Sequence, residues 1–178
     1  MKKVAIVYHS GYGHTEVVAQ HIQKGFTKCE AKLYKVGDFF ENEALFEELS
    51  LANMMVFGSP TYMGTVSADF KKFMDLSSKI WFSQGWKDKL AAGFTNSNSL
   101  NGDKANTMAT LVTFACQHSM LWVSQGVASD GKLNRLGSTI GLFTQASNAA
   151  PAESFGQVDL DTAQAFGKRL CDIVSKIG

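Results

Sequence analysis

The stretch that most constrains the fold of this chain is "KVAIVYHSGYGHTEVVAQHI", residues 3–22. Val4–Tyr8 form a continuous apolar run, which is typical of a strand buried on both faces. A short polar loop with two glycines follows. The apolar residues Val17, Val18 and Ile22 then recur at helical spacing. A buried strand that passes at once into a helix is the repeating unit of α/β folds, whose parallel sheets carry helices on both faces.

Similar strand-like runs recur at helix-sized intervals along the chain. Apolar runs lie at Met54–Phe57, Leu90–Phe94 and Leu121–Val123. The stretch Ala31–Val36 alternates apolar with polar residues, as expected of a more exposed edge strand. The sequence therefore predicts five strands.

Helical patterns fill the gaps between these strands. Ser67 is a plausible N-cap for a helix that carries Phe70 and Phe73. Further helices are predicted at Ala105–Cys116 and Leu160–Ile177, with a short one at Glu43–Leu51.

Alternating strands and helices predict a doubly wound five-stranded parallel sheet of order 2-1-3-4-5, with helices on both faces. With 178 residues, the chain fits one domain, residues 1–178. The Gly-, Ser- and Asn-containing segment from Gln125 to Val158 is long for a connection in a compact domain, which predicts a functional or interface role.

Charge and cysteine content exclude several classes of protein. The formal net charge is +1 and no block of like charge occurs, which argues against a nucleic-acid partner. No window approaches the roughly 20 apolar residues of a membrane span. Cys29, Cys116 and Cys171 show no CxxC spacing, so we expect three buried or half-buried free thiols and a cytoplasmic location.

Three polar loops of small residues each follow a predicted strand: "HSGYGHT", "GSPTYMGTVS" and "TNSNSLNG". In a doubly wound sheet the carboxyl ends of the strands meet at one edge, where ligands bind. The sequence therefore predicts one site built from three loops.

The first of these loops offers backbone N–H groups and the hydroxyls of Ser10 and Thr15 at a helix start, an arrangement that attracts phosphate. It lacks the lysine of a nucleoside-triphosphate P-loop. It is not a GxGxxG motif either, because Glu16 stands at the third glycine position.

The other two loops suit a flat ring. Tyr62, held between Pro60 and Gly64, can stack on such a ring, and the third loop offers amides to its polar edge. Each loop alone is equally typical of an ordinary turn, and Tyr62 could instead pack on its own helix. Together the three loops match the shape of flavin mononucleotide (FMN).

Four segments carry a resemblance to a known family: "KVAIVYHSGYGHTEVVAQHI", "VFGSPTYMGTVSADFKKFMD", "GFTNSNSLNGDKANT" and "FACQHSM". They resemble flavodoxin-like NAD(P)H:quinone oxidoreductases of the tryptophan-repressor-binding-protein type, and the wider NADPH-dependent FMN reductases. The resemblance covers most of the chain and is weakest at residues 29–52 and 125–158. It implies a flavodoxin-like fold, FMN as cofactor, NAD(P)H as donor, a quinone-like acceptor and a homodimer or homotetramer.

Site residues follow from the same resemblance. The implied FMN-binding residues are Ser10, Gly11, Tyr12, Gly13, His14, Thr15, Pro60, Thr61, Tyr62, Met63, Gly64, Thr95, Asn96, Ser97, Asn98, Ser99 and Leu100. The resemblance places Tyr12 also at the donor, Trp81 at the substrate opening and His118, as a catalytic residue, beside the flavin. A helix-terminal structural role is the alternative for His118. Ser138, Thr139 and Gly141 match a loop near a neighbouring subunit's site, and no metal site is expected.

The sequence departs from the family at three places in these loops. Tyr62 stands where the family often has arginine, and Asn98 and Leu100 replace glycines of the third loop. The region between the second strand and Met54 also lacks an insertion found in longer relatives. These differences bear on the donor contact, on how tightly FMN is held and on oligomer geometry.

The leading hypothesis is a two-step exchange, in which NAD(P)H reduces bound FMN and a flat acceptor then takes both electrons from it. A flavodoxin-type electron carrier is one alternative, although a net charge of +1 provides no acidic docking face. A flavin-free interaction protein of the same fold is another, favoured only by Asn98 and Leu100.

Overall fold

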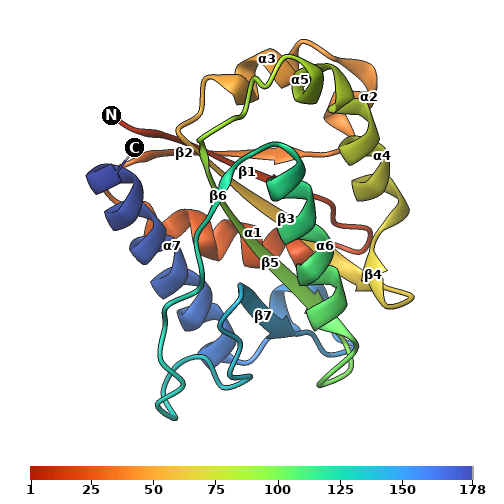
Figure 1. Ribbon diagram of the computed structural model, residues 1–178. Helices are drawn as coiled ribbons and strands as arrows, with labels where there is room; N and C mark the ends of the chain where they lie inside the picture. The colour runs from red at the N-terminus through yellow and green to blue at the C-terminus, as the bar shows by residue number, and fades with distance from the viewer. Residues whose placement is uncertain (178) are drawn as a thin grey trace.

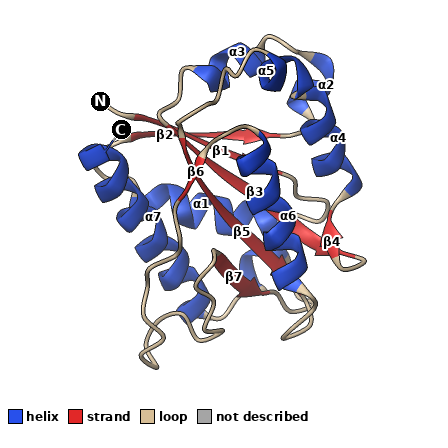
Figure 2. Cartoon of the chain, viewed as in Figure 1, coloured by secondary structure: helices blue, strands red, loops and turns tan. Residues whose placement is uncertain are grey.

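The computed structural model describes residues 1–177, which form one seven-stranded sheet with helices on both faces (Figures 1 and 2). The strands are β1 Lys3–Tyr8, β2 Glu30–Lys35, β3 Met54–Tyr62, β4 Thr65–Val66, β5 Leu90–Ser97, β6 Leu121–Trp122 and β7 Leu142–Gln145. The helices are α1 His14–Gly25, α2 Asp38–Glu41, α3 Leu45–Ser50, α4 Ala68–Leu76, α5 Ser78–Phe82, α6 Lys104–Gln117 and α7 Gln157–Ile177, with a 3₁₀ turn η1 at Pro151–Glu153.

The sheet follows the path β2-β1-β3-β5-β6, which are the five predicted strands in the predicted order. The predicted total of five strands is corrected to seven. The two-residue β4 pairs antiparallel with the end of β3, and β7 pairs parallel with β5. Strand β6 covers only the start of β5, at Leu90 and Ala91, so β7 can pair with its last four residues. Neither added strand is long enough to produce a recognisable periodic pattern.

Alternate residues of the central strands enter two separate cores. On β1, Ile6 joins a core with α1 and α7, whereas Val7 joins a core with α4 and α6 on the opposite face. Figure 1 shows α1 and α7 side by side across one face of the sheet. The predicted N-cap is confirmed, since the Ser67 hydroxyl accepts the N–H of Phe70 at 3.2 Å. No helix within residues 1–177 is long and apolar enough to cross a membrane.

The cysteines differ from expectation. Cys29, at the start of β2, and Cys171, on α7, form a disulfide with their Cα atoms 6.0 Å apart. Cys116 is free but exposed rather than buried. The sequence separation of 142 residues explains the error, because only the packing of α7 beside β2 brings the two thiols together. The cysteines therefore do not support the expected cytoplasmic location, which rested on three free thiols.

Helices α1 and α7 approach each other backbone to backbone. A Cβ placed on Gly167 would meet the carbonyl oxygen of Ile22, and one on Gly25 would meet the carbonyl oxygen of Gln164. Both neighbours are main-chain atoms of packed helices, so neither can turn away. This glycine contact fixes the spacing between the two helices that cover one face of the sheet.

We predict that Gly167→Ala destabilises the fold by about 1–3 kcal/mol, because the added methyl group must push the helices apart. Urea unfolding followed by circular dichroism measures the loss. Gly37→Ala is the matched control, since Gly37 has a helical backbone (φ −60°) and open space around its Cα. Equal unfolding midpoints for Gly167→Ala and the wild type would contradict this account of helix packing.

Candidate functional site

The three polar loops meet at one cavity of about 410 Å³, beyond the carboxyl ends of β1, β3 and β5. Its lining residues are Ser10, Tyr12, His14, Thr15, Pro60, Thr61, Tyr62, Asn96, Ser97, Asn98, Ala146, Ser147 and Asn148. The remaining residues of the predicted FMN set do not line it: Gly11, Gly13, Met63, Gly64, Thr95, Ser99 and Leu100. The geometry thus joins the three predicted loops and adds a fourth, residues 146–148.

The first loop presents backbone donors at the start of α1. Gly13 occupies the N-cap position in a left-handed conformation (φ 89°), and no side chain caps the helix there. The Ser10 hydroxyl accepts only the N–H of Glu16, at 3.1 Å. Within residues 1–177, the backbone N–H groups of residues 11–15 donate no hydrogen bond. These unpaired donors and the helix dipole suit an anionic group.

One carboxylate in the first turn of α1 is paired with a cation. Glu16 lies in the first turn of α1, and its Oε1 forms an ion pair with Nζ of Lys35 at 3.1 Å. The same carboxylate, after burial, also contributes to raising the pKa of the Tyr8 hydroxyl. Its negative charge is therefore partly balanced by Lys35 on β2.

The two glycines of the first loop have close neighbours that would have to move to admit a side chain. A Cβ on Gly11 would lie 2.8 Å from the Tyr62 hydroxyl oxygen. A Cβ on Gly13 would lie 2.8 Å from Cγ of Pro151, and the positive φ of Gly13 also disfavours any side chain. The loop is therefore a tight main-chain cradle, which matches what a phosphate needs.

Buried hydroxyls tie the loops together. Thr15 Oγ1 donates to Asn96 Oδ1 at 2.8 Å, which links the first and third loops. Thr61 Oγ1 lies 2.9 Å from Thr95 Oγ1 and 2.8 Å from Thr107 Oγ1, which links the second loop to β5 and α6. The hydroxyl proton of Thr15 is thus engaged with Asn96, so Thr15 could meet a ligand only through its oxygen lone pairs.

Two tyrosines stand at the cavity with their rings 6.3 Å apart, at an interplanar angle of 67°. Tyr12 is 77% exposed and Tyr62 is 37% exposed. Burial, followed by the nearby Tyr12, raises the pKa of Tyr62, so its hydroxyl stays protonated at neutral pH. Met63 is fully exposed and does not line the cavity.

Residues 146–148 were not among the predicted site residues. The Asn98 side chain donates to Asn148 Oδ1 at 2.8 Å, and the Gln145 side chain donates to the Asn98 carbonyl at 3.0 Å. His14 Nε2 lies 3.2 Å from the Ala149 carbonyl oxygen. The composition of residues 125–158 predicted a functional or interface role for this segment, but residues 146–148 reach the cavity only because β7 pairs with β5.

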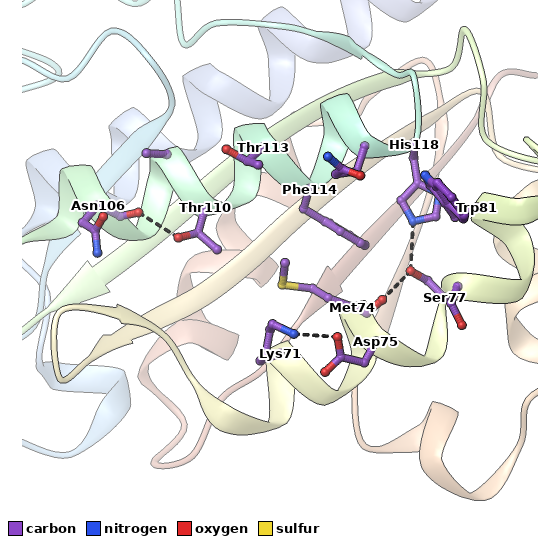
Figure 3. A pocket seen from close by; sticks show the side chains of 13 residues that line it. Lys71, Met74, Asp75, Ser77, Trp81, Asn106, Thr110, Thr113, Phe114 and His118 are labelled. Atoms are coloured by element: carbon purple, nitrogen blue, oxygen red, sulfur yellow. Dashed lines mark hydrogen bonds and ion pairs between the residues drawn. The ribbon is translucent and has the colours of Figure 1, made fainter.

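Trp81 and His118 lie in a different cavity, of about 480 Å³, between α4, α5 and α6 (Figure 3). Figure 3 shows His118 at the end of α6, directed toward Ser77, with Trp81 beside it. Trp81 is 49% exposed, whereas His118 is only 4% exposed. The structure therefore does not bring these two residues to the cavity of the three loops in the same chain.

His118 is a buried neutral imidazole. Burial lowers its pKa to about 4, and its ring lies 4.3 Å from the ring of Trp86. The Ser77 hydroxyl donates to the Met74 carbonyl, so it accepts from His118 Nε2–H at 2.9 Å. Nδ1 has no partner within residues 1–177. This geometry is that of a packed structural histidine rather than of a solvent-connected acid.

Two further observations concern the loop predicted to lie near a neighbouring subunit and the possibility of a metal site. Ser138 Oγ donates to the Gly141 carbonyl within its own loop. No group of three or more His, Cys, Asp or Glu side chains in the described part of the chain is arranged to hold a metal ion.

Comparison with known proteins agrees with the geometry. Residues 2–134 match the NADPH-dependent FMN reductase family. The chain is 39% identical to flavodoxin FldP of Pseudomonas aeruginosa, over 97% of both chains. It is 31% identical to quinone-oxidoreductase QR2 of Triphysaria versicolor, over 98% of this chain and 96% of the relative.

A solved structure extends the match. The flavodoxin, WrbA-like protein from Agrobacterium tumefaciens superposes with a TM-score of 0.82 at 38% identity, over the full length of both chains. The chain therefore belongs to the NADPH-dependent FMN reductase family and is a flavodoxin-like oxidoreductase of the WrbA type.

Proposed function

We propose that this protein is an FMN-dependent oxidoreductase that passes two electrons from NAD(P)H to a quinone or a similar flat acceptor. The observation that carries the proposal is the uncapped start of α1, where the N–H groups of residues 11–15 are unpaired within the described residues and the loop borders a cavity shared with two more polar loops. Relatives named quinone-oxidoreductase QR2 and NAD(P)H dehydrogenase (quinone) support the type of reaction.

In this proposal the N–H groups of residues 11–15 would hold the FMN phosphate, and Tyr62 and residues 96–98 would contact the ring. Bound FMN supplies the chemistry, because its ring accepts a hydride and gives up two electrons. The protein orients the ring and provides uncharged donors to it. The exposed rings of Tyr12 and Tyr62 offer flat apolar surface to a donor or an acceptor.

The second candidate function is an electron carrier that docks on protein partners. It is favoured by the name of the relative flavodoxin FldP, at 39% identity. A net charge of +1 argues against it, because carriers of this kind use an acidic face for steering. A flavin-free role would require that Asn98 block the ring site.

Two expectations stay predictions for this chain: assembly into a homodimer or homotetramer, which the resemblance implies, and a cytoplasmic location. Trp81 and Phe82 expose apolar surface on α5, which is compatible with an interface. In such an assembly, Trp81 could reach a substrate opening only if it belonged to a neighbouring copy.

We predict that Ser10→Ala weakens FMN binding to the apoprotein by about 1.5–3 kcal/mol, the value of a hydrogen bond to a charged group. Thr15→Val, which keeps the shape of the side chain, should weaken binding by separating the first and third loops. Isothermal titration gives the dissociation constants. Ser83→Ala is the control, because Ser83 donates only to Ile80 in a distant turn. Unchanged affinity in both site variants would argue against the phosphate loop.

We also predict that the FMN-loaded protein oxidises NAD(P)H, and that adding benzoquinone speeds up this oxidation with two electrons delivered per turnover. Absorbance at the nicotinamide band, measured with NADH and NADPH in parallel, follows the reaction. A yellow protein that oxidises neither nucleotide in the presence of quinone would favour the carrier. A colourless protein that takes up no FMN would favour the flavin-free alternative.

His118 provides a pH-dependent prediction. Its pKa is about 4 in the folded protein and about 6.5 when unfolded, so the unfolded chain binds more protons between these values. Stability therefore falls as the pH drops from about 6.5 to about 4, by up to about 3 kcal/mol. Urea unfolding at pH 7 and pH 4.5 should show a smaller acid-induced loss in His118→Gln than in the wild type. The pH profile of turnover should show no step from His118 near pH 6.5.

A further inference from the structure

Lys104, the first residue of α6, is a buried cation that the proposed reaction has not yet used. Its side chain is only 1% exposed. Nζ donates to Ser97 Oγ at 2.8 Å, to the Ser99 carbonyl at 3.0 Å and to the Leu100 carbonyl at 2.8 Å. An ammonium group has three N–H donors, whereas a neutral amine would direct a lone pair at one of these oxygens. The three acceptors therefore fit the charged form.

No carboxylate contacts this ammonium group. Among residues 1–177, Lys104 takes part in no ion pair, and all three of its acceptors are uncharged. Asp159 is near enough to favour the charged form, but it binds Arg135 through both oxygens, at 2.7 and 2.9 Å. Two cations and one carboxylate thus leave a net positive charge behind the third loop. Burial lowers the pKa of Lys104, as expected for a cation without a contacting counterion.

The same ammonium group sets the direction of the loop's main chain. It draws the carbonyls of Ser99 and Leu100 toward itself, and no cis peptide occurs in the described chain. In a trans peptide, C=O and the following N–H point in opposite directions. The N–H groups of Leu100 and Asn101 are therefore turned away from Lys104, and neither donates a hydrogen bond within residues 1–177.

This loop belongs to the cavity wall. Ser97, which accepts from Lys104, lines the cavity together with Asn98. Gly102 has no room for a side chain, because a Cβ there would meet Ser97 Oγ. The positive charge is thus fixed one residue layer behind the surface that a ligand would touch.

We propose that Lys104 is a positioning residue that makes the cavity prefer the more negatively charged, reduced form of its cofactor. This inference rests on the proposed function, since it takes FMN as the ligand. Electron uptake adds negative charge to the ring. A fixed cation in surroundings of low polarity stabilises such charge more than water-screened charges do.

A purely structural role makes a different prediction. If Lys104 only braced the loop, its loss would weaken the binding of oxidised and reduced FMN equally. If its charge matters, binding of reduced FMN must weaken more. The ratio of the two dissociation constants therefore separates the two roles, independently of turnover.

The test uses apoprotein titrated with FMN, aerobically for the oxidised form and anaerobically with dithionite for the reduced form. Lys104→Gln keeps N–H donors but removes the charge. We expect it to weaken the binding of reduced FMN about tenfold more than the binding of oxidised FMN. That ratio corresponds to a fall of about 30 mV in the two-electron potential of bound FMN. Lys89→Gln is the matched control, because Lys89 is another lysine whose pKa burial lowers, and its Nζ donates to the Ala52 carbonyl near the opposite ends of the strands.

A second variant covers the case in which Lys104→Gln does not fold. Asp159→Asn keeps a similar shape but removes the carboxylate beside Arg135, so the positive charge behind the loop rises. We expect this variant to shift the ratio in the opposite direction, in favour of reduced FMN. If Lys104, Arg135 and Asp159 only held the loop in place, Asp159→Asn would not shift the ratio of dissociation constants in the direction opposite to Lys104→Gln.

Equal weakening of both forms by Lys104→Gln, or no opposite shift in Asp159→Asn, would overturn this inference and leave the proposed function intact. Failure of the wild-type apoprotein to bind either form of FMN would instead overturn the proposed function itself.

Discussion

Parallel pairing of β1, β3 and β5 is the constraint on which the rest of the molecule depends. Tyr8, the last residue of β1, pairs with Gly58 of β3, and Gly58 pairs with Phe94 of β5. Beyond this point β3 continues to Tyr62 and β5 to Ser97. The pairing also needs Gly58, since a Cβ there would run into the Phe94 ring. Because the three strands run parallel, their carboxyl ends lie at the same edge of the sheet, and the three following loops meet there at the cavity.

In these loops the side chains bind other parts of the protein, whereas main-chain N–H groups stay available to a ligand. Threonine hydroxyls and the Lys104 ammonium group bind other parts of the protein, and thereby hold the loops in place. The main-chain N–H groups of residues 11–15 have no partners in the described part of the chain. A site whose shape is fixed by buried side chains, and whose ligand contacts come from the backbone, needs no reorganisation when an anion binds.

The opening strand–loop–helix unit was predictable because its apolar run and its helical stripe are both long and continuous. The loops of the cavity were predictable for the same reason, since each follows such a strand. Strand β7 and the Cys29–Cys171 pair were not predictable, and the structural position of His118 at the end of a helix was only the alternative to its predicted catalytic role. Each depends on contacts between residues far apart in sequence, and neither β7 nor the cysteines carry a local pattern. A buried lysine such as Lys104 also looks like a surface residue in the sequence, because only the folded loop supplies its three acceptors.

Charge pairing around the cavity explains why a chain of nearly neutral composition can favour an anion. Glu16, in the first turn of α1, is paired with Lys35, and Asp159 is paired with Arg135. These two carboxylates therefore each have a cation, whereas the hydrogen-bond partners of Lys104 are all uncharged. The lining of the cavity itself contains neither lysine, arginine, aspartate nor glutamate. The positive potential comes from a helix end and one buried ammonium group, both fixed by the fold, so it cannot be weakened by the movement of a flexible surface side chain.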